Sequence, residues 1–467
     1  MRALQYVFGT DIEYRYECGS SAWCGKEGMD MNDRQAMAYI EELSHYRGVV
    51  PGLKSIRELC RRLGDPQEQV PVIHIAGTNG KGSTLTYLSS ILMAAGYRVG
   101  SYSSPAVTDY RERFMLNQKM IARTVFTGLL ERVAAAADEM AAEGHAHPTA
   151  FEVETALAFC FFVEKKCDVA VVECGMGGAL DATNLIEKPL VSVLASISMD
   201  HMQFLGGTLA GIAAHKAGII KEGCPVVSTA QKEAAAQVIA QEAEKKHAPL
   251  SVADVKNASG VKYGLSSQSF CYGGYRNLKI SLGGIWQIEN AALAVETVRV
   301  LNRQGFSISE EALRAGLLSA QWRGRLTVLK KKPYVIVDGA HNPDAAEKLA
   351  QSLSFYFTNQ PKVFIMGVLK DKDYEQMIDR MAPLAEQIIA VTPPNARALP
   401  AYELAQAVRK VNEHVTAADS LEEAVEMAYL LAPPEGVIVA FGSLSYLGKL
   451  EHVICDREKT AGAKKAR

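Results

Sequence analysis

The sequence has no long hydrophobic run. No apolar stretch approaches the roughly 18 to 20 residues that cross a membrane, and the N-terminus carries no apolar signal core. It also has no excess of one charge, because 50 Lys and Arg residues stand against 52 Asp and Glu residues. Without a net field, neither nucleic acid nor an anionic membrane is an expected partner. We expect a cytoplasmic monomer whose ligands are small molecules.

Cysteine pairs at C-x-x-C spacing are absent as well. The nine cysteines are an odd number, and several lie in apolar runs. This pattern predicts reduced, mostly buried thiols. Internal repeats and low-complexity tracts are likewise not found.

With 467 residues the chain exceeds a single-core domain, and its pattern predicts two domains. In the first half, short apolar runs alternate with helical periodicity, which indicates a doubly wound α/β domain. The expected strands are 72–76, 99–102, 169–172, 190–195 and 225–227, and the expected helices include 83–95, 125–142 and 153–163. After short strands over 255–285 and a helix over 288–302, a smaller α/β alternation has strands at 334–337, 363–366, 388–391 and 437–441.

The expected division of the chain follows these patterns. Residues 1–30 form an N-terminal extension of unknown role, 31–320 a central domain and 327–455 a C-terminal α/β domain. Between the two domains, Trp322, Arg323, Gly324 and Arg325 interrupt the periodic segments, which places a linker at 321–326. The Lys- and Arg-rich tail, 456–467, is predicted to be frayed.

The stretch V-I-H-I-A-G-T-N-G-K-G-S-T, residues 72–84, predicts a strand, a tight turn and a helix that starts at Ser83. Gly77, Gly80 and Gly82 let successive N–H groups face inward, Lys81 adds a positive charge, and the helix start adds a positive dipole end. These features predict a site for a nucleoside triphosphate. A glycine-rich turn without a ligand is the alternative. The first two glycines are separated by two residues, where the common phosphate loop has four.

Polar residues follow two of the predicted strands. Glu173 comes directly after the strand 169–172, and His201 follows the next strand along the chain. In an open α/β sheet, ligands bind beyond the carboxyl ends of the strands, so Glu173 is placed to meet Mg²⁺ on a bound triphosphate. A solvated strand-end glutamate is the alternative. From chemistry alone, His201 is equally a helix cap or a core histidine, because a hard cation prefers oxygen ligands.

Lys216 falls on the apolar face of a predicted helix, three and four residues from aliphatic neighbours. Burial lowers the pKa of a lysine, and a neutral amine reacts with CO₂ to give a carbamate whose oxygens suit Mg²⁺. A lysine that snorkels to solvent is the alternative, and the residue pattern alone favours it.

In the second half, the stretch D-G-A-H-N-P at 338–343 also follows a strand and enters a helix. Its Asp338 and His341 are therefore placed at a ligand-binding strand end. Arg325 in the linker carries a planar guanidinium that is suited to phosphate. Surface residues or helix caps are the alternatives for each of the three.

Taken together, these segments resemble the folylpolyglutamate synthase and dihydrofolate synthase family, relatives of the Mur ligases. The similarity runs from about residue 39 to residue 447. It is carried, in the family's order, by G-T-N-G-K-G-S (77–83), Y-S-S-P (102–105), E-C-G-M-G-G-A-L-D-A-T-N (173–184), D-H-M-Q-F-L-G (200–206), K-A-G-I-I-K (216–221) and D-G-A-H-N-P (338–343). The resemblance implies an ATP-binding Mur-ligase-like central domain and a C-terminal glutamate-ligase domain.

The resemblance also implies roles for single residues. ATP phosphates are held by Asn79, Gly80, Lys81 and Gly82 beside Ser83, and the remaining ATP contacts are Asn290, Arg325 and Asp338. The magnesium ligands are Ser104, Glu173 and His201, and Lys216 corresponds to the carbamylated lysine. The pteroate-binding segments contain Thr149, Phe151, Glu152, Leu180, Asp181 and Ala182. Phe151 suits stacking on a pterin ring, with a plain core phenylalanine as the alternative. Ala106, Ala179 and Trp286 depart from the family's usual residues.

The reaction implied by the resemblance transfers the γ-phosphoryl group of ATP to a substrate carboxylate, and the amine of glutamate then attacks the acyl phosphate. Lys81 and Mg²⁺ would offset the charge on the transferring group. His341 is expected to help place glutamate. A bifunctional dihydrofolate/folylpolyglutamate synthase is the expected function, with a folylpolyglutamate synthase as the first alternative. A Mur-type ligase of nucleotide-linked peptides and a non-ligating P-loop ATPase are the others.

Overall fold

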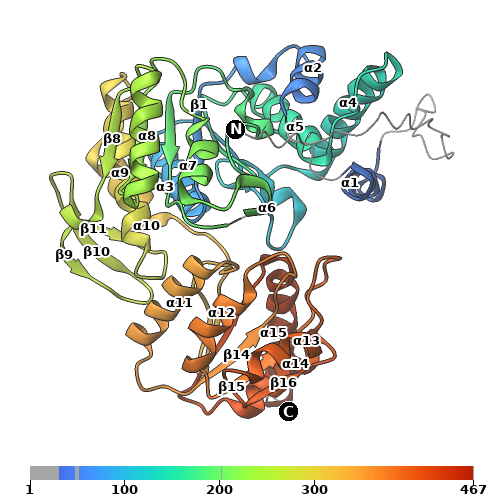
Figure 1. The fold of residues 1–467 in the computed structure, drawn as a ribbon, viewed down its shortest axis with the longest axis vertical. Coiled ribbons are helices and arrows are strands. Elements are labelled where there is room, and N and C mark those ends of the chain that lie inside the picture. The colour runs from blue at the N-terminus through green and yellow to red at the C-terminus, as the bar shows by residue number, and fades with distance from the viewer. Residues whose placement is uncertain (1–30, 48–51, 201, 466–467) are drawn as a thin grey trace, which may run out of the picture.

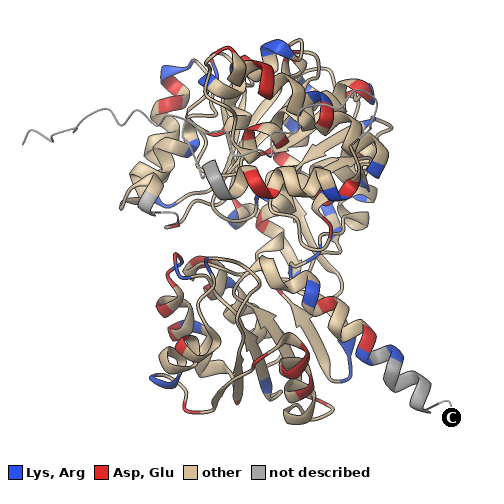
Figure 2. Cartoon of the chain, turned by 90° about the vertical axis from the view of Figure 1, so that its right-hand side faces the viewer, with Lys and Arg blue, Asp and Glu red and all other residues tan. Residues whose placement is uncertain are grey.

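The computed structural model describes residues 31–47, 52–200 and 202–465. The predicted extension 1–30, Cys18, Cys24 and His201 lie outside these residues. The described chain forms two α/β units that meet at the segment 320–326 (Figure 1). No helix within the described residues is long and apolar enough to cross a membrane. Acidic and basic residues are interspersed along both units (Figure 2), in keeping with the net charge of -2.

The first unit is built on an eight-stranded sheet with the order β4-β3-β2-β5-β1-β6-β7-β8. Its parallel strands are β2 (Val99–Tyr102), β5 (Val169–Glu173), β1 (Val72–Ala76), β6 (Val191–Leu194), β7 (Val226–Thr229) and β8 (Leu250–Ala253). The short strands β3 (Phe114–Leu116) and β4 (Lys119–Met120) close one edge in antiparallel pairing. Every residue of β1 and β5 is buried, as expected for a parallel sheet covered on both faces.

Helices cover both faces of this sheet, which confirms the predicted doubly wound architecture. One face packs against α3 (Lys81–Ala94), α9 (Gln287–Arg303) and α10 (Glu310–Ser319). The other packs against α1 (Asp33–Arg47), α2 (Lys54–Arg62), α4 (Arg123–Ala142) and α5 (Ala150–Glu164), and farther along against α7 (Leu209–Ala217) and α8 (Glu233–Lys245). The short helix α6 (Met202–Leu205) precedes α7. A small antiparallel sheet, β9 (Ser259–Lys262), β10 (Gln268–Tyr272) and β11 (Tyr275–Ile280), follows β8.

The second unit is a six-stranded sheet with the order β12-β13-β17-β14-β15-β16. Its strands are β12 (Thr327–Lys331), β13 (Tyr334–Val337), β14 (Lys362–Met366), β15 (Gln387–Ala390), β16 (Val415–Ala417) and β17 (Val437–Phe441), and all but β12 are parallel. One face packs against α11 (Pro343–Tyr356), α12 (Tyr374–Met381) and α13 (Ala401–Arg409). The other packs against α14 (Leu421–Leu431) and α15 (Leu444–Lys465).

Several helix boundaries differ from the sequence-based expectation, and two of the differences bear on the site or the tail. The helix after the glycine-rich loop begins at Lys81 and not at Ser83, because Gly80 caps it with a φ of 87° that favours glycine. Within the tail predicted to be frayed, the described residues 456–465 are helical, because α15 continues to Lys465. Arg457 fixes the start of that extension by lying 3.8 Å from the Tyr429 ring centre and 2.8 Å from Glu426. The described cysteines are free thiols, and four of them are buried.

Candidate active site between the two units

One pocket lies where the two units meet, at the carboxyl ends of their parallel strands. The first unit contributes the glycine-rich loop 77–83, Ser104, Glu173, Asp200, Lys216, Trp286 and Asn290, and the second contributes Arg325, Asp338, His341, Ala345 and Lys348. All predicted ATP-contact and catalytic residues therefore line one pocket, as do Ser104 and Glu173. We call it the junction pocket.

The glycine-rich loop is held tightly from behind. The N–H groups of Thr78 and Asn79 both donate to Ser196 O, at 2.8 and 3.1 Å. A Cβ at Gly80 would lie 2.4 Å from Asn290 Oδ1, so only glycine fits there. The first N–H groups of α3, which have no acceptor within the helix, are thus fixed at the pocket wall. Such groups form an anion site.

Glu173 and Lys81 form the charged floor of the pocket. The Lys81 Nζ lies 3.6 Å from Glu173 Oε1 and donates to Thr78 O at 3.2 Å. Glu173 is only 5 % exposed, so the alternative of a solvated strand-end glutamate is wrong. Burial raises the pKa of Glu173, and the charges of Lys81 and Arg325 oppose that rise.

Lys216 is buried beside this floor. Its side chain is 4 % exposed, and its Nζ donates to Gly77 O at 2.8 Å. Snorkelling, which the residue pattern alone favours, is therefore wrong: the amine points into the unit and not to solvent. Burial lowers the pKa of Lys216 to about 7, with a further contribution from the positive charge of Lys81. A substantial neutral fraction at neutral pH meets the chemical requirement for carbamate formation.

Oxygen donors for a hard cation are present in the pocket. Ser104 and Glu173 both line it, whereas His201 lies outside the described residues. Among the described residues there is no cluster of three or more His, Cys, Asp or Glu side chains arranged to hold a metal. Mg²⁺ in nucleotide sites commonly uses one or two carboxylates together with substrate phosphates, so this donor set fits it.

The second unit closes the pocket through Asp338 and its neighbours. Asp338 follows β13, and its carboxylate accepts from the N–H groups of Leu326 and Ala340 at 2.7 and 2.8 Å. Burial raises the pKa of Asp338, and the nearby Arg325 guanidinium lowers it. Asp338 thus ties the linker to the second sheet and keeps Arg325 at the pocket. The surface-residue alternative for Asp338 is wrong, because the residue is 3 % exposed.

His341 has a defined tautomer. Its Nδ1 lies 2.8 Å from Gly339 O, so that nitrogen carries the proton and donates. Nε2 is then an acceptor, and it lies 3.8 Å from Asp200 Oδ2. Burial and the positive charge of Lys372 lower the pKa of His341 to about 4.

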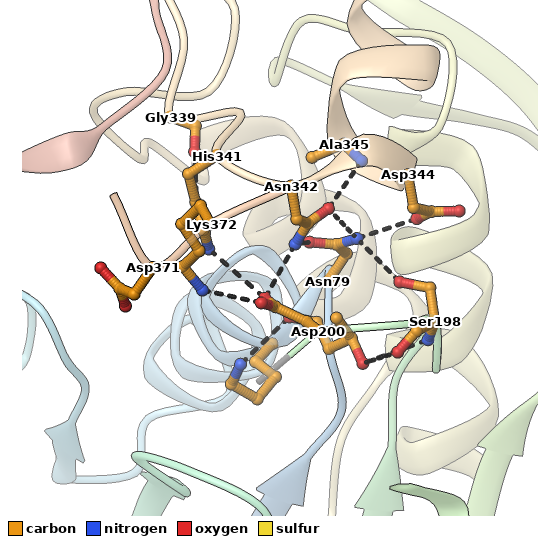
Figure 3. A network of polar contacts seen from close by, with 12 residues as sticks. Asn79, Ser198, Asp200, Gly339, His341, Asn342, Asp344, Ala345, Asp371 and Lys372 are labelled. Carbon is orange, nitrogen blue, oxygen red and sulfur yellow. Dashed lines mark hydrogen bonds and ion pairs between the residues drawn. The ribbon is translucent and has the colours of Figure 1, made fainter. Parts of the chain in front are cut away.

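A polar network that the sequence did not reveal joins the two units across the pocket (Figure 3). The Asn79 Nδ2 donates to Asp344 Oδ2 at 2.8 Å, and Asn342 Nδ2 donates to Asn79 Oδ1 at 3.1 Å. On the other side, Asp200 accepts from Asn342 at 3.1 Å and from Lys372 at 2.7 Å. We call these five residues the inter-unit network. Asp200 and Asn342 each stand inside a motif, which is the signal that could have pointed to them.

Two further residues that reach the glycine-rich loop were not predicted as site residues. Gln287, the first residue of α9, donates from Nε2 to Ser83 Oγ at 3.1 Å. The Trp322 indole lies against Gly82, where an added Cβ would meet ring atoms at 3.0 Å. Neither residue belongs to a recognisable motif. The fold brings them to the loop from positions more than 200 residues away in the sequence.

The predicted pteroate-binding residues do not line the junction pocket. Thr149 and Glu152 form a capping box at the start of α5. Asp181 accepts from the N–H groups of Met176 and Thr183. Leu180 is 50 % exposed, and Ala182 is buried. The Phe151 ring packs against Gly175, a residue that does line the pocket, and stacks on Tyr102 at 6.0 Å between ring centres. Of these residues, Phe151 and Asp181 contact the loop 174–178.

Comparison with known proteins finds relatives that share both units. Two family models match, the Mur ligase middle domain over residues 75–298 and the Mur ligase glutamate ligase domain over residues 324–444. A dihydrofolate synthase/folylpolyglutamate synthase of Bacillus subtilis is 39% identical over 351 residues, which cover 73% of this chain and 81% of the relative. A folylpolyglutamate synthase of Lacticaseibacillus casei is 35% identical and covers 89% of this chain and 96% of the relative.

A solved structure is similar over nearly the whole chain. The Mycobacterium tuberculosis folylpolyglutamate synthase in complex with ADP superposes with a TM-score of 0.84 at 30% identity, covering 90% of this chain and 98% of that one. Both units and the segment that joins them are thus shared. The chain belongs to the folylpolyglutamate synthase and dihydrofolate synthase family of the Mur ligases.

Proposed function

We propose that this chain is an ATP-dependent ligase that joins L-glutamate to the carboxylate of dihydropteroate and of reduced folates. One observation carries the proposal: a single pocket receives a phosphate-binding loop from one unit and Arg325, Asp338 and His341 from the other. A ligase must hold ATP, an acid and an amine together, and a site between two units offers walls for all three.

The residues of the pocket suit an acyl-phosphate route. The γ-phosphoryl group passes from ATP to the carboxylate, and ADP leaves. The glutamate amine then attacks the acyl carbon, loses a proton, and displaces inorganic phosphate. The first N–H groups of α3, Lys81 and Arg325 orient the phosphates and offset their charge. Ser104, Glu173 and His201 are the proposed holders of Mg²⁺, which would stabilise charge on the transferring group.

The carboxylate substrate is proposed to enter from the side of the loop 174–178. Thr149, Phe151, Glu152, Leu180, Asp181 and Ala182 stand there as the proposed pteroate contacts. The position of Phe151 against Gly175 supports this assignment, because Gly175 lines the pocket. His341 is proposed to receive glutamate at the opposite wall.

The test supplies purified protein with ATP, Mg²⁺ and labelled glutamate, and offers dihydropteroate or a reduced folate in separate tubes. Label in both products is the expected result. Product from the folate alone would restrict the chain to folylpolyglutamate synthesis. ATP hydrolysis without either product would overturn the ligase assignment and favour a plain ATPase.

We further propose that the protein acts as a monomer in the cytoplasm. The unpaired thiols support a reducing compartment. Light scattering after size exclusion should give the 50.7 kDa mass of one chain. A doubled mass would contradict the monomer.

A further inference from the structure

A chain of hydrogen bonds ends on the hydroxyl of the glycine-rich loop. Asn290 Nδ2 donates to Gln287 Oε1 at 3.1 Å, and Gln287 Nε2 donates to Ser83 Oγ at 3.1 Å. We propose that Gln287 is a positioning residue that turns the Ser83 hydroxyl into a hydrogen-bond donor for a nucleotide phosphate. This inference rests on the proposed nucleotide-binding function.

The burial of Gln287 argues for a specific task. Its side chain is fully buried, and the fold brings it against Ser83, which lies 204 positions earlier in the chain. A buried carboxamide is costly unless both of its ends are paired, and both are paired here. Ser83 is itself 1 % exposed and lines the junction pocket. The first turn of α9 thus delivers one polar group to one loop hydroxyl.

The direction of the chain follows from donor chemistry. An amide nitrogen only donates, so Ser83 Oγ must accept from Gln287, and its single hydrogen stays available for another partner. The Gln287 oxygen is already engaged by Asn290. Asn290 is itself 4 % exposed, and its Oδ1 occupies the space where a Cβ of residue 80 would lie. The hydroxyl hydrogen of Ser83 is therefore left for an acceptor in the pocket, and phosphate oxygens are strong acceptors.

The neighbouring hydroxyl provides an internal contrast. Thr84 is also buried, but its Oγ1 has no hydrogen-bond partner among the described residues, and it does not line the pocket. Of the two successive hydroxyls, only Ser83 is oriented by the protein. Ser83 also lies two positions after Lys81, and not directly after it as in the common phosphate loop, where the hydroxyl binds Mg²⁺. A donor role toward phosphate suits this altered spacing.

A double-mutant cycle tests the proposal through ADP binding measured by calorimetry. Ser83→Ala and Gln287→Met should each weaken ADP binding about tenfold, the size expected for one lost hydrogen bond to a charged group. The double variant should bind no more weakly than either single variant, because both changes remove the same contact. Gln67→Met is the matched control, a buried glutamine outside the pocket, and should leave ADP affinity unchanged.

Losses that add up in the double variant would overturn the proposal and assign Gln287 a purely structural role. An unchanged affinity in Gln287→Met would overturn it as well. If thermal melting shows that Gln287→Met does not fold, the cycle uses Gln287→Glu instead. This variant keeps the side-chain shape, but its carboxylate oxygen accepts the Ser83 hydroxyl hydrogen that would otherwise go to the phosphate. Wild-type protein that binds no ADP would instead contradict the proposed function.

Discussion

Lys216 is buried, and its lowered pKa lets the amine lose its proton near neutral pH. Its pKa of about 7 means that the amine is mostly protonated below pH 7 and mostly neutral above it. Only the neutral amine reacts with CO₂, so the carbamate at Lys216 should increase as the pH rises from 6 to 8. Because its pKa in the fold is lower than in the unfolded chain, the same group also makes the fold more stable as pH rises from about 7 toward 10.5.

The measurement is ¹³C NMR of protein equilibrated with ¹³C-bicarbonate at several pH values. Surface amines give carbamate signals too, so the signal of Lys216 is the one that disappears in Lys216→Met. A difference signal that is absent at pH 8, or that grows as the pH falls, would contradict the expectation.

His341 is the residue on which glutamate binding should depend most. Because the Nδ1–H of His341 donates a hydrogen bond to Gly339 O, the neutral Nε2 can accept a hydrogen bond from the incoming amine. His341→Ala should raise the glutamate KM about tenfold, the equivalent of one polar contact, and change the ATP KM little. Since the pKa of His341 is about 4, the effect should be constant from pH 6 to pH 9. Steady-state kinetics with varied glutamate checks this, and an unchanged KM would remove His341 from the glutamate wall.

At the residue scale, strand ends and motifs predicted residues that line the pocket, although for Lys216 the residue pattern alone favoured snorkelling and only the resemblance placed it in the site. Glu173, Lys216 and Asp338 each end a strand or lie on an apolar helix face, and all three line the pocket. Gln287 and Lys372 could not be found in this way. Their hydrogen-bond partners lie 204 and 172 positions away in the sequence, so a local residue pattern cannot reveal them.

In the first unit, α10 packs closely against α3. A Cβ at Gly316 of α10 would lie 2.3 Å from the Ile91 Cα of α3, so the two backbones touch. Gly316→Ala should therefore destabilise the protein by about 1–3 kcal/mol, the usual cost of overpacking. Gly128 of α4, whose Cβ position is open, is the matched control. Gly128→Ala should stabilise by roughly 0.5–1 kcal/mol.

Thermal melting of the two alanine variants decides between these effects. A similar change at both sites would mean that helix propensity, and not the contact between α3 and α10, sets the response. Because α3 begins at the glycine-rich loop, Gly316→Ala should also weaken ADP binding.

At the element scale, the long and fully buried strands were predicted to within a residue or two. The strands that escaped prediction are β3, β4, β8, β12 and β16, all of them at or beside sheet edges. Such strands are short or partly exposed, and none contains a continuous apolar run longer than three residues. Their existence depends on the neighbouring strand, which a local pattern does not contain.

The inter-unit network is one of the contacts that hold the two units together. Lys372 of the second unit and Asp200 of the first are each 8 % exposed in their side chains and lie 2.7 Å apart. Removing one partner of a buried pair typically costs about 3–5 kcal/mol. Separation of the units would let Asp200 regain water, so Lys372→Met should shift the molecule toward an open form.

Small-angle X-ray scattering checks this expectation through a larger radius of gyration for Lys372→Met. Arg380→Met is the control, because Arg380 pairs at 3.5 Å with Glu347, which belongs to the same unit. An unchanged radius for Lys372→Met would show that other contacts hold the units together.

The packing of Trp322 on Gly82 has an optical consequence. The chain contains three tryptophans, and the two within the described residues both meet the junction pocket: Trp286 lines it, and Trp322 lies on its glycine-rich loop. Indole emission changes in colour and intensity with the polarity around the ring. The protein therefore carries a built-in fluorescent reporter, whose signal should change when the pocket fills and needs no added dye.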